Sequence, residues 1–202
     1  LQHPPEAVHG LEGSQQDGTL GAAFLFDLST GEQLAELRSA MTEAEDRFGA
    51  SVAIGDGVAL VAAPNENENA RNAGRVYVFD LSNPGAPIEA DRLQPSQIEH
   101  HAGFGTAMAI DGSTAAISEI GGGDSGRVHL YRLTDPTDPV RLAEIEPPVE
   151  GAFEQFGWSI DFDDRRLLIG AYGSAAMLYE VQFASDPIFR STLAVPDPAS
   201  IS

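Results

Sequence analysis

Three segments of this 202-residue chain repeat one pattern: an aromatic-glycine pair, an alternating apolar run, a short turn and two further apolar runs. The pairs are Phe48-Gly49, Phe104-Gly105 and Phe156-Gly157, which lie 56 and 52 residues apart. A fixed period near 50 residues, with each unit built of short strands, is typical of a β-propeller. The repeat therefore predicts an all-β fold made of similar antiparallel units.

The third run of each unit ends in an aromatic residue, and these residues extend the repeat over nearly the whole chain. Phe26, Phe79, Tyr131 and Tyr179 are spaced by 53, 52 and 48 residues, and a fourth apolar run follows each. Four runs match the four antiparallel strands of a propeller blade, here named A to D from the axis outward. We expect six aromatic residues to be buried at equivalent blade positions: Phe48, Phe104, Phe156, Phe79, Tyr131 and Tyr179.

The spacing divides the chain into four blades of one domain over residues 1–202. Blade 1 covers about 6–38, blade 2 about 48–95, blade 3 about 104–146 and blade 4 about 156–195. Aligning the repeats places Ala7 to Gly10 at strand B, so blade 1 lacks its innermost strand and the Phe-Gly pair. We expect a piece of a longer propeller, or completion by another chain, rather than a closed four-blade monomer, because an unpaired edge strand favours aggregation.

Short turns join strands A and B of the complete blades. Asp56-Gly57 and Asp111-Gly112 are predicted hairpin turns, because Asp and Gly tolerate positive φ, and Asp163-Asp164-Arg165 takes this place in blade 4. Strand A of blade 4 is expected at Ser159–Phe162 and strand D at Phe189–Val195. Trp158 is expected in the core, with a stacking role at the mouth of the propeller channel as the alternative.

Charge excludes some classes of partner. The net charge is −20 and all 11 basic residues are arginine, so a phosphate backbone or an anionic membrane is repelled. No apolar run approaches the ~18 residues that span a bilayer, and Leu1 does not begin a signal-peptide pattern. The absence of cysteine excludes disulfides and thiolate metal sites. The acidic surface serves solubility or complements a basic partner.

The repeat resembles the FG-GAP repeat of integrin α-subunit propellers and of many bacterial surface proteins. The Phe-Gly pairs carry the resemblance, Ala62-Ala63-Pro64 matches the Gly-Ala-Pro of the family, and Asp46 to Ile54 is similar to the bacterial subtype. Ser118-Glu119-Ile120 matches the Gly-Ala-Pro poorly. The resemblance implies a propeller outside the cytoplasm (extracellular, cell-surface or periplasmic) that acts in protein binding or adhesion.

Integrin-type repeats often hold calcium in an Asp-rich loop between strands A and B, but here that loop has shrunk to a turn. Asp161, Asp163 and Asp164 form the one weak calcium candidate, beside the charges of Arg165 and Arg166. Calcium needs six to eight oxygen ligands, so we expect no bound metal and no cofactor.

In this family the D–A and B–C loops share one face of the propeller, and loops on a rigid scaffold commonly carry binding residues. This face supplies the candidate partner-binding residues: Asp46, Arg47, Asn65, Asn67, Asn69, Glu99, His100, His101 and Tyr172. His129 alternates with Val128 and Leu130, so it is expected to pack between blades. The glycine-rich run 121–126 precedes a strand rather than a helix, which argues against a phosphate site.

Two functions remain open. The first is a non-enzymatic protein-binding or scaffolding module that uses the loop face or a blade edge, with another protein chain as its partner. The second is an enzyme that acts on a carbohydrate or ester at the mouth of the propeller channel. Its site would combine residues from several blades, each of which departs from the repeat pattern at one position. Its candidate residues are Asp46, Glu99, His101, Glu154 and Tyr172. The sequence favours the first, because it contains no Gly-x-Ser-x-Gly motif and places no carboxylate pair as acid and base.

Overall fold

The computed structural model describes residues 6–11, 21–121, 125–147, 154–172, 175–183 and 187–191. These residues form four antiparallel sheets, one for each repeat unit, with strands in simple sequential order. The chain is an all-β propeller of four-stranded blades, and the described residues of its first blade form three strands. The predicted fold is confirmed, and no innermost strand is present among the described residues of the first blade.

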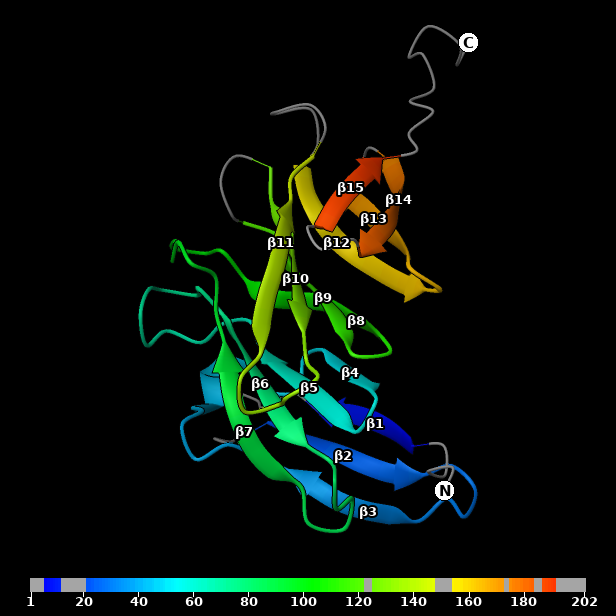
Figure 1. Cartoon of the computed structure of the whole chain (residues 1–202). Coiled ribbons are helices and arrows are strands. Elements are labelled where there is room, and N and C mark those ends of the chain that lie inside the picture. The colour runs from blue at the N-terminus through cyan, green and yellow to red at the C-terminus, as the bar shows by residue number, and fades with distance from the viewer. Residues whose placement is uncertain are drawn as a thin grey trace, which may run out of the picture.

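The blades follow each other along the chain as a row (Figure 1). Blade 1 contains β1 (Glu6–Leu11), β2 (Ala22–Asp27) and β3 (Gln33–Leu37). Blade 2 contains β4 (Val52–Gly55), β5 (Val58–Ala63), β6 (Arg75–Asp80) and β7 (Ile88–Leu93). Blade 3 contains β8 (Phe104–Asp111), β9 (Thr114–Glu119), β10 (Arg127–Arg132) and β11 (Val140–Ile145). Blade 4 contains β12 (Glu154–Asp163), β13 (Arg166–Tyr172), β14 (Ala175–Phe183) and β15 (Pro187–Ser191).

The core lies between the blades, with one apolar cluster at each of three interfaces. Phe48 belongs to the cluster between blades 1 and 2, Phe104 to that between blades 2 and 3, and Phe156 to that between blades 3 and 4. All three rings have 0% exposure, and Phe79 and Tyr131 are buried as well. The side chain of Tyr179 lies outside the described residues. Because a single blade cannot bury both of its faces, each phenylalanine holds two neighbouring blades together.

The glycine of each Phe-Gly pair allows the blades to approach closely. Gly49, Gly105 and Gly157 have φ of 91°, 90° and 91°, a backbone conformation that favours glycine. A Cβ on Gly105 would lie 2.8 Å from the Cβ of Ala62 in the preceding blade. The backbone N–H of Phe104 also donates to the carbonyl of Ala73 at 2.8 Å. The repeated motif is therefore explained by contact between blades.

Three strand boundaries differ from the sequence expectation, which places strand A of blade 3 at Thr106–Ile110. Strand A of blades 3 and 4 begins at or before the Phe-Gly pair, because Phe104 and Phe156 already pair with strand B across an irregular register. Strand D of blade 4 begins at Pro187, earlier than the predicted Phe189. The expected end of that strand, Val195, lies outside the described residues.

The aspartates at the A–B turns of blades 2 and 3 occupy different positions. Asp56 and Gly57 have φ of 36° and 75°, so the predicted hairpin turn is present there. The prediction of an Asp111-Gly112 turn is wrong by one residue, because Asp111 pairs with Thr114 and extends β8. Its carboxylate instead accepts a hydrogen bond from the backbone N–H of Arg165 in blade 4 at 2.9 Å. Asp111 therefore links two neighbouring turns.

Candidate functional site

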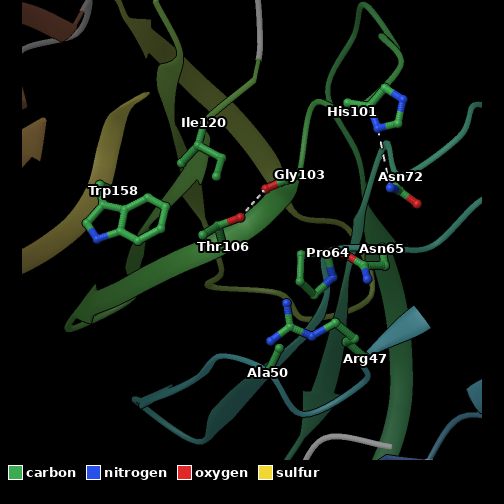
Figure 2. Close-up of a pocket in the computed structure, with 10 residues that line it drawn as sticks. All are labelled: Arg47, Ala50, Pro64, Asn65, Asn72, His101, Gly103, Thr106, Ile120 and Trp158. Carbon is green, nitrogen blue, oxygen red and sulfur yellow. Dashed lines mark hydrogen bonds between the residues drawn. The ribbon is translucent and has the colours of Figure 1, made fainter. Parts of the chain in front are cut away.

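A recess of about 290 Å³ opens where loops from blades 2, 3 and 4 meet (Figure 2). Its polar wall comes from three connecting loops and from the start of β8. Its apolar wall comes from residues beside β4, β5 and β9 and from β12. The residues that line it are Arg47, Ala50, Pro64, Asn65, Asn72, His101, Gly103, Thr106, Ile120 and Trp158. Three of the nine predicted contact residues, Arg47, Asn65 and His101, are among them.

Arg47 reaches the recess because the chain turns sharply before the Phe48-Gly49 pair. A short 3-10 helix, η1 (Ala44–Asp46), ends at Arg47, whose φ of 60° is left-handed. The carboxylate of Asp46 accepts a hydrogen bond from the backbone N–H of Glu43 at 2.7 Å. Figure 2 shows the guanidinium of Arg47 directed toward the space between Ala50 and Thr106. The turn thus presents this cation to the recess.

Asp46 has a structural position rather than an exposed one. Its side chain is buried, and its backbone carbonyl accepts a hydrogen bond from the N–H of Asn65 at 3.2 Å. Burial raises the pKa of the Asp46 carboxyl, against the opposing effect of the N–H bond from Glu43. We infer that Asp46 fixes the turn and the adjacent loop instead of contacting a partner itself.

The B–C loop of blade 2 contains the three predicted asparagines, which divide between two roles. Asn65 lines the recess. The amide oxygen of Asn67 accepts a hydrogen bond from the backbone N–H of Asn72 at 2.9 Å, and the amide nitrogen of Asn69 donates to Gln94 at 2.8 Å. Asn67 and Asn69 therefore stabilise the loop that presents Asn65 and Asn72.

The D–A loop that leads into blade 3 lies beside this B–C loop. The backbone N–H of His101 donates to the carbonyl of Arg71 at 2.7 Å, and Nδ1 of His100 accepts from the N–H of Arg71 at 3.2 Å. The two loops therefore form one surface. The adjacent histidines separate, since His100 contacts the neighbouring backbone and His101 lines the recess.

The ring of His101 is held by an amide from the other loop. Its Nδ1 lies 3.3 Å from Nδ2 of Asn72, as the dashed line in Figure 2 shows. With Asn72 donating, Nδ1 accepts this hydrogen bond, so the contact holds the ring of His101 between the two loops.

One exposed aromatic ring lines the recess and contacts a second exposed ring. Trp158 of β12 is 47% exposed and lines the recess, so the expectation that it packs in the core is wrong. Tyr172 at the end of β13 is 57% exposed, and its ring lies 5.4 Å from that of Trp158 at a tilt of 58°. Trp158 follows the buried Phe156-Gly157 pair, and the bulge there turns its side chain outward. Trp158 thus lies on the surface at the recess, and its stacking role remains a prediction.

A buried ionic network supports the D–A loop, and sequence reasoning missed its central carboxylate. Glu119 and His129 both have 0% exposure, and Oε2 of Glu119 lies 2.6 Å from Nε2 of His129. Arg127 approaches Glu119 at 3.6 Å, Glu144 at 3.5 Å and Glu99 at 2.9 Å. Glu99 therefore anchors its loop to β10. The available signal was the poor match of Ser118-Glu119-Ile120 to the repeat.

Blade 2 contains the counterpart of this network. Arg75 occupies the position of Arg127 and pairs with Glu66 at 3.2 Å and with Glu68. It also donates to Gln94 at 3.2 Å. The arginine that opens strand C thus holds the loops of its own blade in both cases. In blade 2, Tyr77 replaces the histidine and packs edge-on to Phe48, as His129 packs edge-on to Phe104 in blade 3.

No metal centre is found in the part of the chain that the structure describes, where no group of three acidic or histidine side chains could hold a metal ion. Asp161 bonds to the adjacent backbone N–H of Phe162, and Asp164 lies 3.8 Å from Arg166. The weak calcium candidate formed by Asp161, Asp163 and Asp164 therefore receives no geometric support.

The candidate residues for an enzyme do not converge. His101 lines the recess, Glu99 pairs with Arg127, Asp46 is buried in its turn, and Tyr172 contacts Trp158. The side chain of Glu154 lies outside the described residues, as do residues 122–124 of the glycine-rich run. The described geometry thus gathers hydrogen-bonding groups and aromatic rings without a paired acid and base.

Comparison with known proteins supports the repeat directly. The family model of the FG-GAP repeat matches residues 32–79, a span from β3 to the aromatic end of β6. The chain carries an FG-GAP repeat. No curated protein matches the chain. Among the described residues, no helix has the length and apolar character needed to cross a membrane.

Two solved structures show the same fold at low identity. The periplasmic gluconolactonase of Pseudomonas aeruginosa aligns with a TM-score of 0.55 and 12% identity, over 87% of this chain and 50% of that one. A putative 6-phosphogluconolactonase from Bacteroides fragilis gives 0.56 and 12%, over 87% and 48%. This chain therefore spans about half the length of both of these proteins.

Proposed function

We propose that this chain is a non-enzymatic binding module that holds a partner, in the first place another protein outside the cytoplasm, on its loop face. One observation carries the proposal: segments from separate repeats build a recess lined by the exposed ring of Trp158, which contacts the exposed ring of Tyr172. Exposed aromatic groups beside hydrogen-bonding side chains are common features of binding sites. The FG-GAP repeat and the propeller fold support a scaffold that presents such loops.

The anchoring contacts support this function. The hydrogen bonds of Asn67, Asn69 and Glu99 fix the two loops before a partner arrives. A preorganised surface loses less conformational entropy on binding than a mobile one. In this proposal these residues act through the loops, whereas His101 and Trp158, which line the recess, contact the partner directly.

The test compares capture by the unchanged chain with capture by a double variant, His101→Ala with Trp158→Ala. The immobilised full chain is incubated with an extract of the cells that produce it, and retained proteins are quantified. We expect a defined partner to be retained by the unchanged chain and by the control Arg132→Gln, an exposed position on β10, and lost from the double variant. Equal retention by all three chains would refute a role for the loop face.

A second candidate is an enzyme that hydrolyses an ester or lactone at the recess. The similarity of the fold to two lactonases favours it. The separation of its candidate residues weighs against it, because Glu99 pairs with Arg127 and Asp46 is buried in its turn. Acid release from aldonolactones, followed by titration, should not exceed the spontaneous rate. An excess that disappears in His101→Ala would establish the enzyme instead.

A further inference from the structure

The residue after each Phe-Gly pair lines the recess, so the repeat allows three equivalent positions to be compared there. Ala50 follows the pair of blade 2, Thr106 that of blade 3 and Trp158 that of blade 4. Two blades therefore place a small side chain at this position, and the third places an indole. Because Trp158 is 47% exposed, packing of the core does not explain this departure from the repeat.

A second departure from the repeat lies beside the first. Six residues after the first residue of strand B, blade 2 has Pro64, blade 3 has Ile120 and blade 4 has Tyr172. Pro64 and Ile120 line the recess, whereas Tyr172 is 57% exposed and its ring centroid lies 5.4 Å from that of Trp158 at a tilt of 58°. Blade 4 therefore has aromatic side chains at both positions, and these two rings form an exposed aromatic corner.

Hydrogen-bonding side chains line other parts of the same recess. Asn65 and Asn72 contribute amides and Thr106 contributes a hydroxyl, while Asn72 also holds the ring of His101. Figure 2 shows the indole of Trp158 on one side of the recess and the pair of Asn72 and His101 on the other. The recess thus combines an apolar ring surface with amide and hydroxyl groups that donate and accept hydrogen bonds.

These features suit a ligand with an apolar face and several hydrogen-bonding groups at its rim. A neutral sugar ring has both, because C–H groups gather on its faces and hydroxyls surround it. The volume of about 290 Å³ lies near the lower end of the range for small-ligand sites, roughly 300–1,000 Å³, which suits one ring. Arg47 also lines the recess but already has an interaction within the chain, so the neutral groups define the ligand class.

We infer that the recess binds one neutral sugar residue, with a face of its ring on Trp158, its edge beside Tyr172 and its hydroxyls on the polar wall. This inference deepens the proposed function and rests on it, because it assigns a ligand class to the same loop face. A sugar residue on a glycan of the partner protein and one of a free saccharide share this chemistry. A proline-rich peptide is the competing occupant, but it is extended and offers backbone carbonyls as its hydrogen-bonding groups.

The experiment titrates the full chain in a calorimeter with the neutral tetrasaccharides of glucose, galactose, mannose and N-acetylglucosamine. Glycerol, which has hydroxyls without a ring, and hexaproline, which has apolar rings without hydroxyls, are the comparison compounds. Trp158 is the one tryptophan of the sequence, so its fluorescence gives a second signal from the recess. We expect saturable binding of at least one tetrasaccharide with a change in this fluorescence, and an affinity at least tenfold lower for glycerol and hexaproline.

Variants that restore the repeat test the aromatic corner while keeping the fold. Trp158→Thr and Tyr172→Ile introduce the side chains that blade 3 carries at the equivalent positions, and circular dichroism checks that both variants are folded. Trp158→Thr should lower the saccharide affinity at least tenfold, Tyr172→Ile should lower it several-fold, and Trp158→Phe should retain most of it. The matched control is Leu168→Ala, at a 43% exposed side chain of β13 outside the recess, which should bind as the unchanged chain.

Three results would overturn the inference: no tetrasaccharide binds, hexaproline binds as tightly as the best saccharide, or a folded Trp158→Thr variant keeps the full affinity. If no saccharide binds but the variant with His101→Ala and Trp158→Ala still loses its protein partner, the ligand class is wrong and the loop face remains the binding site. If that variant retains the partner as well, the loop face itself is refuted.

A positive result leaves the source of the sugar to be identified. The partner captured by the unchanged chain is treated with glycosidases and offered to the chain again. Lost capture would assign the recess to a glycan on the partner, and unchanged capture would assign it to a free saccharide.

Discussion

At the scale of single residues, the Phe-Gly pairs hold the propeller together. Each phenylalanine is buried between two blades, and each glycine has a positive φ near 90°. The two residues have separate tasks, since the ring fills the interface and the missing side chain lets the blades approach. Substitutions at the two positions should therefore fail for different reasons.

Phe104→Ala should lower the free energy of unfolding by roughly 3–5 kcal/mol, because the fully buried ring leaves a cavity between blades 2 and 3. Urea unfolding followed by circular dichroism measures the change. The matched control is Ile88→Ala, at a side chain that is 66% exposed, where a change within about 0.5 kcal/mol is expected. Equal effects at the two positions would contradict the assignment of Phe104 to the interface.

Gly105→Ala and Gly31→Ala separate backbone strain from contact between blades. Both glycines have positive φ, but a Cβ on Gly31 meets nothing within 4 Å, whereas one on Gly105 would lie 2.7 Å from Val76 and 2.8 Å from Ala62. Gly31→Ala should cost about 1–2 kcal/mol from the left-handed backbone, and Gly105→Ala about 1–3 kcal/mol more. Thermal unfolding of both variants checks this, and equal costs would exclude the steric explanation.

At the scale of elements, the arginine at the start of strand C holds the loops of the candidate site. Arg75 and Arg127 occupy equivalent positions on β6 and β10, and each is buried among carboxylates. Glu119 has no exposure to water, and its carboxylate is compensated by Arg127 and His129. The loop face is thus supported by residues that do not line the recess.

Arg127→Met should destabilise the chain by about 3–5 kcal/mol, because it leaves the buried carboxylate of Glu119 with less compensation. Adding Glu119→Gln should restore part of the loss, since it removes the uncompensated charge. Urea unfolding of Arg127→Met, Glu119→Gln and the double variant gives a double-mutant cycle that measures their coupling. The exposed Arg132→Met is the control. A cost no larger than that of Arg132→Met would show that the network is not important for folding.

At the scale of the whole molecule, the composition gives the protein an unusual response to alkaline pH. The sequence contains no lysine, and arginine stays protonated, so tyrosine is the side chain that titrates between pH 10 and 12. Burial raises the pKa of Tyr77 and of Tyr131 from 10.0 to about 12 in each case. The folded chain therefore binds these two protons more tightly than the unfolded chain does.

The contribution of these tyrosines is complete below pH 10 and is lost as the pH rises through 12, because their pKa is higher in the folded chain. The free energy of unfolding should fall over this range by on the order of 2 kcal/mol per tyrosine. Urea unfolding at pH 9.5 and 11.5 measures the decrease. Tyr131→Phe should show a smaller decrease, and an unchanged decrease would exclude Tyr131 as a cause.

The sequence alone determined the blade architecture, and the reason is local. Phe48, Phe104 and Phe156 recur because every blade must fill the same interface, and Asp56-Gly57 marks a hairpin because its backbone requires positive φ. Such requirements act on a few adjacent residues, so they leave a visible period. The loop face was also predictable, since propeller topology brings the D–A and B–C loops together.

The tertiary structure decided which side chains meet on that face. Trp158 is exposed because a bulge after Phe156 changes the direction of its side chain, and Glu119 is buried because β10 places His129 and Arg127 beside it. Neither outcome follows from a local pattern, since each depends on the register of strands far apart in the sequence. Period and turn chemistry fix the blades, whereas the packing of three blades fixes the recess.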